Sequence, residues 1–202
     1  MIAVALEKLV PDFIKCFDAY IPSKPDDELK RIYGCHKLYR LNNNENPLGP
    51  PPAAREVIQS FQPATASVYP SGDCYHLRRK LAERFLISPD QILAGNGANE
   101  VIAFVIKAFC REGDNIVTAD KTFAVYEWVA EFSGFEARLV PLEDYGFSDH
   151  GLLARVDDRT KVIFICNPNN PTGTYWNRSR LEAFLDHVAG RQIVVLDEAY
   201  AE

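Results

Sequence analysis

Three short polar segments each follow directly after a strongly apolar run of the chain. The segments are Gly95 to Glu100, Asn167 to Gly173 and Asp197 to Tyr200. In open parallel sheets, ligands bind beyond the carboxyl ends of the strands. If the apolar runs are strands of one such sheet, the three segments are therefore expected to meet at a single binding site.

Asp197 follows the apolar run Ile193 to Leu196. Removing a carboxylate from water costs free energy unless a cation or hydrogen-bond donors compensate it. A carboxylate at this position therefore indicates a binding role, and capping of a following helix is the alternative. Glu198 is expected to face the other way.

The segment Gly95 to Glu100 lies between a predicted strand and an apolar helical pattern. Glycines let the backbone approach a ligand closely, and the free N–H groups of a helix N-terminus bind phosphate. The first two glycines resemble the dinucleotide-binding fingerprint, but Glu100 occupies the place of the third. A nicotinamide cofactor is therefore disfavoured, and a tight turn without a ligand remains the alternative.

The segment Asn167 to Gly173 is rich in asparagine and proline. Asn170–Pro171 is a candidate for a cis peptide bond, which is normally found in a rigid turn. Such a loop can present an asparagine side chain to a ligand in a fixed orientation. A loop with turn chemistry alone is the other interpretation.

From residue 91 onward, short apolar runs alternate with longer helical patterns. The predicted strands are Gln91 to Ala94, Asn115 to Ala119, Ala137 to Pro141, Lys161 to Cys166 and Gln192 to Leu196. The predicted helices are Asn99 to Cys110, Thr122 to Phe132 and Asn177 to Val188. This alternation predicts a three-layer α/β/α fold around a mostly parallel sheet.

The first 50 residues lack this regular alternation of apolar runs and helical patterns. Residues 2–20 show a helical pattern that Pro11 interrupts, and the acids after Pro25 open a second short helix. Lys37 to Leu41 is predicted to be a strand, and the turn-rich stretch that follows marks a boundary. We expect an N-terminal arm and small-domain segment over residues 1–50 and the first part of a large domain over residues 51–202, beginning with helices at Ala53 to Phe61 and Asp73 to Leu86.

The composition excludes several other classes of protein. The chain has 202 residues, of which 47% are hydrophobic and 25% charged, as in ordinary globular proteins. Its net charge of -6 argues against a nucleic-acid partner, and no apolar run approaches the roughly 20 residues of a membrane span. Without a recognisable signal peptide we expect a cytoplasmic protein. Its five cysteines contain no Cys-x-x-Cys pair, which predicts reduced thiols and no metal site.

Taken together, the motifs resemble a known family. They are Leu41 to Pro50, Tyr69-Pro70, Gly95 to Glu100, Asn167 to Gly173 and Asp197 to Tyr200. In this order they resemble the pyridoxal phosphate-dependent aminotransferases of fold type I, most closely the histidinol-phosphate aminotransferases. The resemblance runs from about Tyr20 to the last residue.

The resemblance implies pyridoxal 5'-phosphate as the cofactor and assigns roles to three catalytic residues. Asp197 would pair with the protonated pyridine nitrogen, so that the ring acts as an electron sink. Asn170 and Tyr200 would bind the 3-hydroxyl oxygen of the ring. The backbone N–H groups of Ala98 and Asn99 would bind the phosphate of the same cofactor.

The resemblance also implies contacts on the ring face, at the dimer interface and near the substrate. Phe123 would stack on the cofactor, with a core position in its helix as the alternative. Tyr69 would reach the phosphate of the neighbouring subunit, which implies a homodimer. Tyr20, Asn44 and Gly49 would border the substrate.

The implied reaction transfers an amino group between an amino donor and a 2-oxo acid. The expected donor is histidinol phosphate, in histidine biosynthesis, or an aromatic amino acid, and the expected acceptor is 2-oxoglutarate. A related phosphothreonine decarboxylase carries the same motifs, so that reaction is the alternative.

Two departures from the family pattern stand out. Lys121 replaces the usual proline before Thr122, and Phe123 replaces a tyrosine. In addition, no lysine of the sequence lies in the segment that carries the family's Schiff-base lysine, which follows the motif ending at Tyr200. We therefore expect the 202-residue chain alone to be inactive. A non-catalytic relative that binds a ligand or partner remains the alternative from another class.

Overall fold

The computed structural model describes residues 8–15, 17 and 24–201. The chain divides into two compact units, one made of Met1–Ala19 and Leu93–Glu202 and the other of Tyr20–Ile92. We call the first the sheet unit and the second the helical unit, and each is described by itself. The predicted boundary after residue 50 falls inside the helical unit and stays a prediction.

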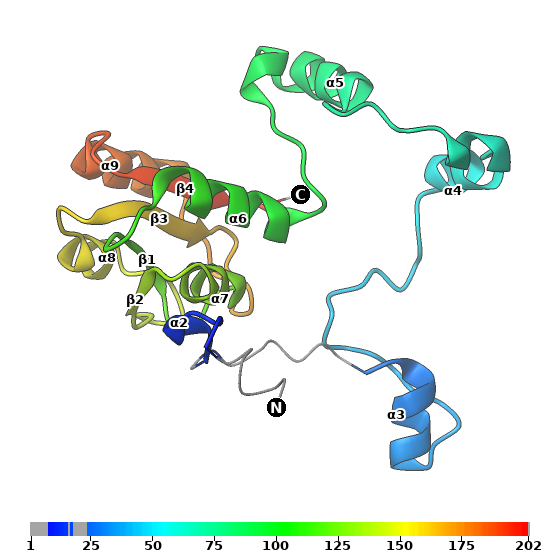
Figure 1. Cartoon of the computed structure of the whole chain (residues 1–202), viewed down its shortest axis with the longest axis horizontal. Helices are drawn as coiled ribbons and strands as arrows, with labels where there is room; N and C mark the ends of the chain where they lie inside the picture. Colours follow the sequence, from blue (N-terminus) through cyan, green and yellow to red (C-terminus); the bar gives the residue numbers. More distant parts are fainter. Residues whose placement is uncertain (1–7, 16, 18–23, 202) are drawn as a thin grey trace. The chain divides into compact units, whose positions relative to one another are not determined.

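The sheet unit is built on four parallel strands (Figure 1). They are β1 (Asn115–Ala119), β2 (Glu136–Val140), β3 (Thr160–Cys166) and β4 (Ile193–Asp197). Their order across the sheet is β2-β1-β3-β4. The register pairs Cys166 with Asp197 and Ala119 with Val140, so the carboxyl ends of the strands lie along one edge.

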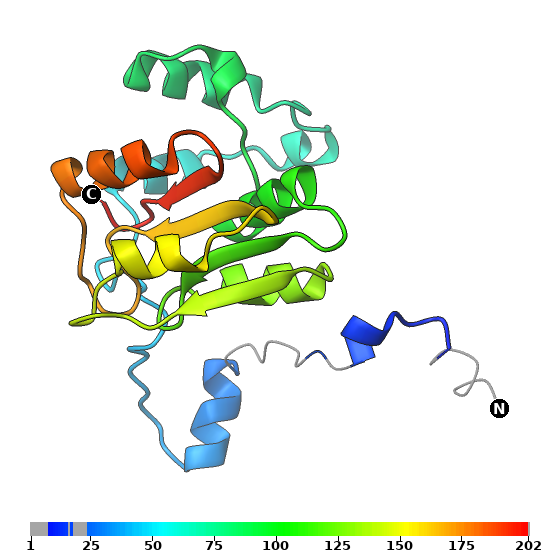
Figure 2. The ribbon, with the colours of Figure 1, turned by 90° about the vertical axis from the view of Figure 1, so that its left-hand side faces the viewer.

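Helices cover both faces of this sheet (Figures 1 and 2). On one face lie α6 (Ala98–Phe109) and α7 (Val125–Phe132), and on the other lie α8 (Asp149–Arg155) and α9 (Arg178–Val188). A short helix, α2 (Asp12–Lys15), packs near α7, where Phe17 contacts Trp128 with ring centroids 5.4 Å apart. The predicted three-layer α/β/α arrangement with a parallel sheet is confirmed.

The core of the sheet unit lies between the sheet and its helices. Each residue of β1 is buried, and so are six of the seven residues of β3. Apolar side chains of α6, α7 and α9, such as Ile106, Tyr126 and Phe184, pack against them with almost no exposed surface. This continuous burial explains why the central strands appear in the sequence as unbroken apolar runs.

The helical unit contains no strand among residues 24–92. Its elements are α3 (Asp26–Tyr33), α4 (Pro52–Gln59), η1 (Pro63–Ser67), α5 (Tyr75–Phe85) and η2 (Pro89–Gln91). Ala82 is the only buried residue in this range, and large apolar side chains such as Leu41, Leu48 and Tyr69 are exposed.

The structure differs from the local predictions at four places. Lys37 to Leu41 and Gln91 to Ala94 form no strand, because no segment of the described residues pairs with their backbones. The prediction also missed α8, whose start is marked by Ser148: its hydroxyl accepts a bond from the Gly151 N–H, as a helix N-cap does. Helix α7 begins at Val125, three residues later than predicted, because residues 120–124 form a turn.

No helix among the described residues is long and apolar enough to cross a membrane.

Candidate functional site

A cavity of about 170 Å³ lies at the carboxyl edge of the sheet. Its lining comes from the ends of β3 and β4, the N-terminus of α6 and the turn before α7. The lining residues are Ala98, Phe123, Cys166, Asn170, Asp197, Ala199 and Tyr200. The structure thus brings together five of the residues singled out in the sequence, from segments more than 100 positions apart.

Asp197 is the last residue of β4 and is half-buried. The Tyr126 hydroxyl donates a hydrogen bond to Asp197 Oδ2 at 2.6 Å, and the Ala199 N–H donates to Oδ1 at 3.1 Å. Each carboxylate oxygen accepts up to two hydrogen bonds, so the group retains acceptor capacity toward the cavity. No cation pairs with Asp197 among the described residues.

Tyr126 lies in the first turn of α7 and is fully buried. Its ring stacks on Phe164 with centroids 4.8 Å apart and meets Phe123 edge-on at 5.7 Å. Burial, and secondly the hydrogen bond to Asp197, raise the pKa of the Tyr126 phenol well above its ordinary value. The phenol therefore stays protonated and acts as a donor toward the carboxylate.

The loop after β3 holds two asparagines in contrasting surroundings. The peptide bonds before Pro168 and Pro171 are both cis. Asn169 is 3% exposed: its amide donates to the Lys121 carbonyl at 3.0 Å and to Thr172 Oγ1 at 2.8 Å, and its oxygen accepts a bond from Thr122 Oγ1 at 2.7 Å. Asn169 therefore ties this loop to the turn that carries the cavity-lining ring before α7.

Asn170 is half-buried, and within the described part of the chain its side-chain amide has no hydrogen-bond partner. Only its backbone N–H is engaged, donating to Cys166 Sγ at 3.4 Å. An amide that lines a cavity without an internal partner is available to a ligand.

The N-terminus of α6 opens onto the cavity at Ala98. Gly97 precedes it with φ +83°, a conformation that side-chain-bearing residues rarely adopt. The N–H groups of Ala98 and Asn99 belong to the first turn, where a helix offers no internal acceptor. Glu100, which occupies the place of a third glycine, accepts a bond from the Asn96 N–H at 2.6 Å and so stabilises the turn.

Tyr200 lines the cavity three residues beyond Asp197, in the segment after β4. Cys166 lies opposite Asp197 in the register of β3 and β4, and its thiol is buried. That burial raises the pKa of the Cys166 thiol, so the group is a thiol rather than a thiolate.

Three residues of this site were not singled out from the sequence: Tyr126, Asn169 and Cys166. Asn169 lies within the predicted loop motif and Cys166 directly before it, so their position at a strand end was a usable signal. Tyr126 gave no such signal, because a tyrosine in an apolar helix is indistinguishable from a core residue until its hydroxyl is seen to meet Asp197.

Four further residues predicted for the site are not among those that line the cavity. Tyr69, Asn44 and Gly49 belong to the helical unit, and all three are exposed. Tyr20 lies outside the described residues. The roles of these four residues stay predictions.

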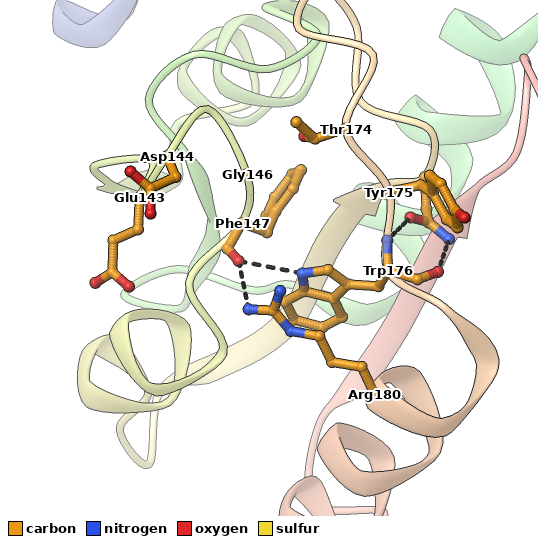
Figure 3. A pocket seen from close by; sticks show the side chains of 9 residues that line it. Glu143, Asp144, Gly146, Phe147, Thr174, Tyr175, Trp176 and Arg180 are labelled. Carbon is orange, nitrogen blue, oxygen red and sulfur yellow. Dashed lines mark hydrogen bonds between the residues drawn. The ribbon is translucent and has the colours of Figure 1, made fainter.

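A larger hollow of about 300 Å³ lies beside the loop that follows β3 (Figure 3). Several of its polar groups are bonded to one another: the Trp176 indole N–H and the Arg180 guanidinium both donate to the Phe147 carbonyl, and Asn167 exchanges two bonds with the Trp176 backbone. Arg180 also lies over the Trp176 ring, 4.7 Å from its centroid. These groups hold the loop in place, and we assign no ligand to the hollow.

No cluster of histidine, cysteine or acidic side chains suited to a metal ion occurs in the described ranges 8–15, 17 and 24–201.

Comparison with known proteins identifies relatives over most of the chain. The sequence model of the family "Aminotransferase class I and II" matches residues 36–202. A histidinol-phosphate aminotransferase of Stutzerimonas stutzeri is 44% identical over 185 residues, and one of Bacillus cereus is 42% identical over 184 residues. Each alignment covers 91% of this chain and 50% of the relative. The chain thus spans about half the length of the curated relatives it matches.

Solved structures agree with this result. The crystal structure of histidinol-phosphate aminotransferase from Sinorhizobium meliloti, in complex with pyridoxal-5'-phosphate, matches with a TM-score of 0.83 and 25% identity. The match covers 95% of this chain and 51% of that structure. An aspartate aminotransferase from Thermotoga maritima shares the fold, with a TM-score of 0.73 at 23% identity.

Proposed function

Since this chain belongs to the aminotransferase class I and II family, we propose that it forms the cofactor-binding part of an enzyme that uses pyridoxal 5'-phosphate. The observation that supports this most directly is the cavity at the strand ends, where the Asp197 carboxylate, the Asn170 amide and the N-terminus of α6 converge. These are an anion for a protonated ring, a hydrogen-bonding group for a ring oxygen and donors for a phosphate.

The groups around the cavity fit this cofactor chemically. Asp197 has acceptor capacity left after its bonds from Tyr126 and Ala199, and a protonated ring nitrogen is a donor that can use it. The amide of Asn170 has no partner among the described residues, which leaves it for the 3-hydroxyl oxygen. The first N–H groups of α6 are those that phosphate-binding helices use.

Each residue then has a specific task. When bound, pyridoxal phosphate supplies an electron sink for the electrons released at the substrate α-carbon. Asp197 keeps the proton on the ring nitrogen, Asn170 and Tyr200 orient the ring through its 3-hydroxyl oxygen, and Phe123 covers a ring face. Ala98 and Asn99 hold the phosphate through their backbone N–H groups.

For the substrates we propose histidinol phosphate as amino donor and 2-oxoglutarate as acceptor. The names of the two histidinol-phosphate aminotransferases described above support this donor, and a 2-oxo acid is the acceptor that transamination requires. An aromatic amino acid is the second donor to be tested. We also propose a homodimer in which Tyr69, which is 98% exposed, contacts the cofactor phosphate of the neighbouring subunit.

The test uses the complete gene product, loaded with pyridoxal phosphate. Formation of glutamate from 2-oxoglutarate is measured with histidinol phosphate and, separately, with phenylalanine and tyrosine. We expect the highest kcat/KM with histidinol phosphate, and near-complete loss of activity in Asp197→Ala with the fold retained. Absence of transamination with every donor, or wild-type turnover by Asp197→Ala, would contradict the proposal.

A further inference from the structure

Tyr126 joins two parts of the cavity wall that are far apart in sequence. Its hydroxyl, on α7, donates to the carboxylate of Asp197 at the end of β4, 71 positions away, at 2.6 Å. No family motif quoted above includes this tyrosine. Its side chain nevertheless meets the Asp197 carboxylate, which lines the cavity.

We propose that Tyr126 is a positioning residue, which holds the Asp197 carboxylate in the orientation that binds the ring nitrogen of the cofactor. This inference rests on the function proposed above. The Asp197 carboxylate accepts a hydrogen bond at each of its two oxygens, from the Tyr126 hydroxyl and from the Ala199 N–H. Together these two donors restrict rotation of the carboxylate.

The surroundings of Tyr126 make it a rigid donor. Its ring is 0% exposed and lies nearly parallel to Phe164, with an interplanar angle of 13°. Because burial keeps the phenol protonated, the O–H remains a donor over the pH range in which enzymes usually work. The same ring touches Phe123 edge-on, so one buried side chain supports both the ring-binding acid and the stacking ring.

The test measures binding of pyridoxamine 5'-phosphate, the amine form of the cofactor, which needs no lysine to bind. Isothermal titration gives its Kd for the complete gene product as wild type and as Tyr126→Phe. We expect the variant to bind about tenfold more weakly, as loss of a bond to a charged group predicts. The phenylalanine keeps the ring stacked on Phe164, and circular dichroism verifies that the variant is folded.

Thr118→Val is the matched control. Thr118 is 1% exposed and its hydroxyl donates to the Phe164 carbonyl at 3.1 Å, so this change also removes one buried hydroxyl bond from the same core. Thr118 does not line the cavity. We expect its Kd to stay within about twofold of wild type, although its thermal stability falls as that of Tyr126→Phe does.

A double-mutant cycle separates positioning from a general structural effect. If Tyr126 acts through Asp197, adding Tyr126→Phe to Asp197→Asn changes the Kd by less than about twofold, whereas independent effects would multiply. 4-Aminophenylalanine at position 126 retains a donor and is expected to restore most of the affinity.

The outcomes separate this inference from the proposed function. A wild type that binds the probe, together with a Tyr126→Phe variant that binds it equally well, overturns the inference alone. Multiplicative effects in the cycle, or an equal loss in Thr118→Val, also overturn it. A wild type that does not bind the probe overturns the proposed function and this inference with it.

Discussion

Asn169 and Asn170 are adjacent, yet the structure predicts that replacing Asn169 by alanine lowers the stability of the fold whereas replacing Asn170 by alanine does not. Asn169→Ala removes three side-chain hydrogen bonds from a residue that is 3% exposed. At about 1 kcal/mol net per bond, reduced because Lys121 and Thr122 lie partly in water, the free energy of unfolding should fall by about 2 to 3 kcal/mol. Asn170→Ala removes no intramolecular side-chain bond seen in the described residues and should change it by less than about 0.5 kcal/mol.

Urea unfolding followed by tryptophan fluorescence measures this difference in the sheet unit. The chain has two tryptophans, Trp128 and Trp176, and both lie in that unit. With a urea dependence of about 2 kcal/mol per M, the midpoint of Asn169→Ala should fall by about 1 M or more. Binding of pyridoxamine 5'-phosphate should instead weaken in Asn170→Ala, whose stability is unchanged. Equal destabilisation by the two changes would refute the assignment of a structural role to Asn169 and a ligand-binding role to Asn170.

Three further predictions concern the same unit. A Cβ on Gly151 would lie 2.8 Å from Val140 Cγ1, so Gly151→Ala should lower the free energy of unfolding by about 1 to 3 kcal/mol in the urea assay. Gly146→Ala should lower it less, because a Cβ there would lie 3.6 Å from its nearest neighbour, the Glu143 carbonyl oxygen. Equal losses in the two variants would contradict this prediction. Hydrogen bonds from an asparagine amide and an arginine hold the pKa of Asp157 below its ordinary 3.8, so its stabilisation is full above that pH and is lost as the pH falls through its folded pKa. Stability measured down to pH 2 should therefore fall less steeply in Asp157→Asn than in wild type, and parallel curves would count against the bond. Exposed Cys74 should react with a disulfide reagent long before buried Cys166, whose raised pKa disfavours the thiolate; simultaneous labelling would show that the cavity wall is open.

The sheet unit was predictable from the sequence because its central strands, β1 and β3, are buried. Runs such as Ile163 to Ile165 have no polar interruption, and the residue after each run marks the edge where ligands bind. The convergence of Asp197 and Asn170 on one cavity followed from that rule. Ala98 also lines the cavity, although the strand predicted before it, Gln91 to Ala94, does not form.

The errors have equally physical causes. Lys37 to Leu41 has the composition of a strand, but a strand forms only where a second segment pairs with it. The sequence of the segment itself does not show whether such a partner exists. Helix α8 is seven residues long, which is too short for a helical repeat of apolar residues to be recognised. The N-cap residue Ser148 was the one signal of its start. Tyr126 was missed because the bond that gives it a task joins residues 71 positions apart.

The central claim is that the strand-end cavity holds a pyridoxal cofactor by its ring nitrogen and its phosphate. A crystal structure of the complete gene product with pyridoxamine 5'-phosphate tests it most directly. We predict the ring nitrogen within hydrogen-bond distance of the Asp197 carboxylate and the phosphate at the N–H groups of Ala98 and Asn99. A cofactor bound elsewhere, with Asp197 making no contact to it, would contradict the account.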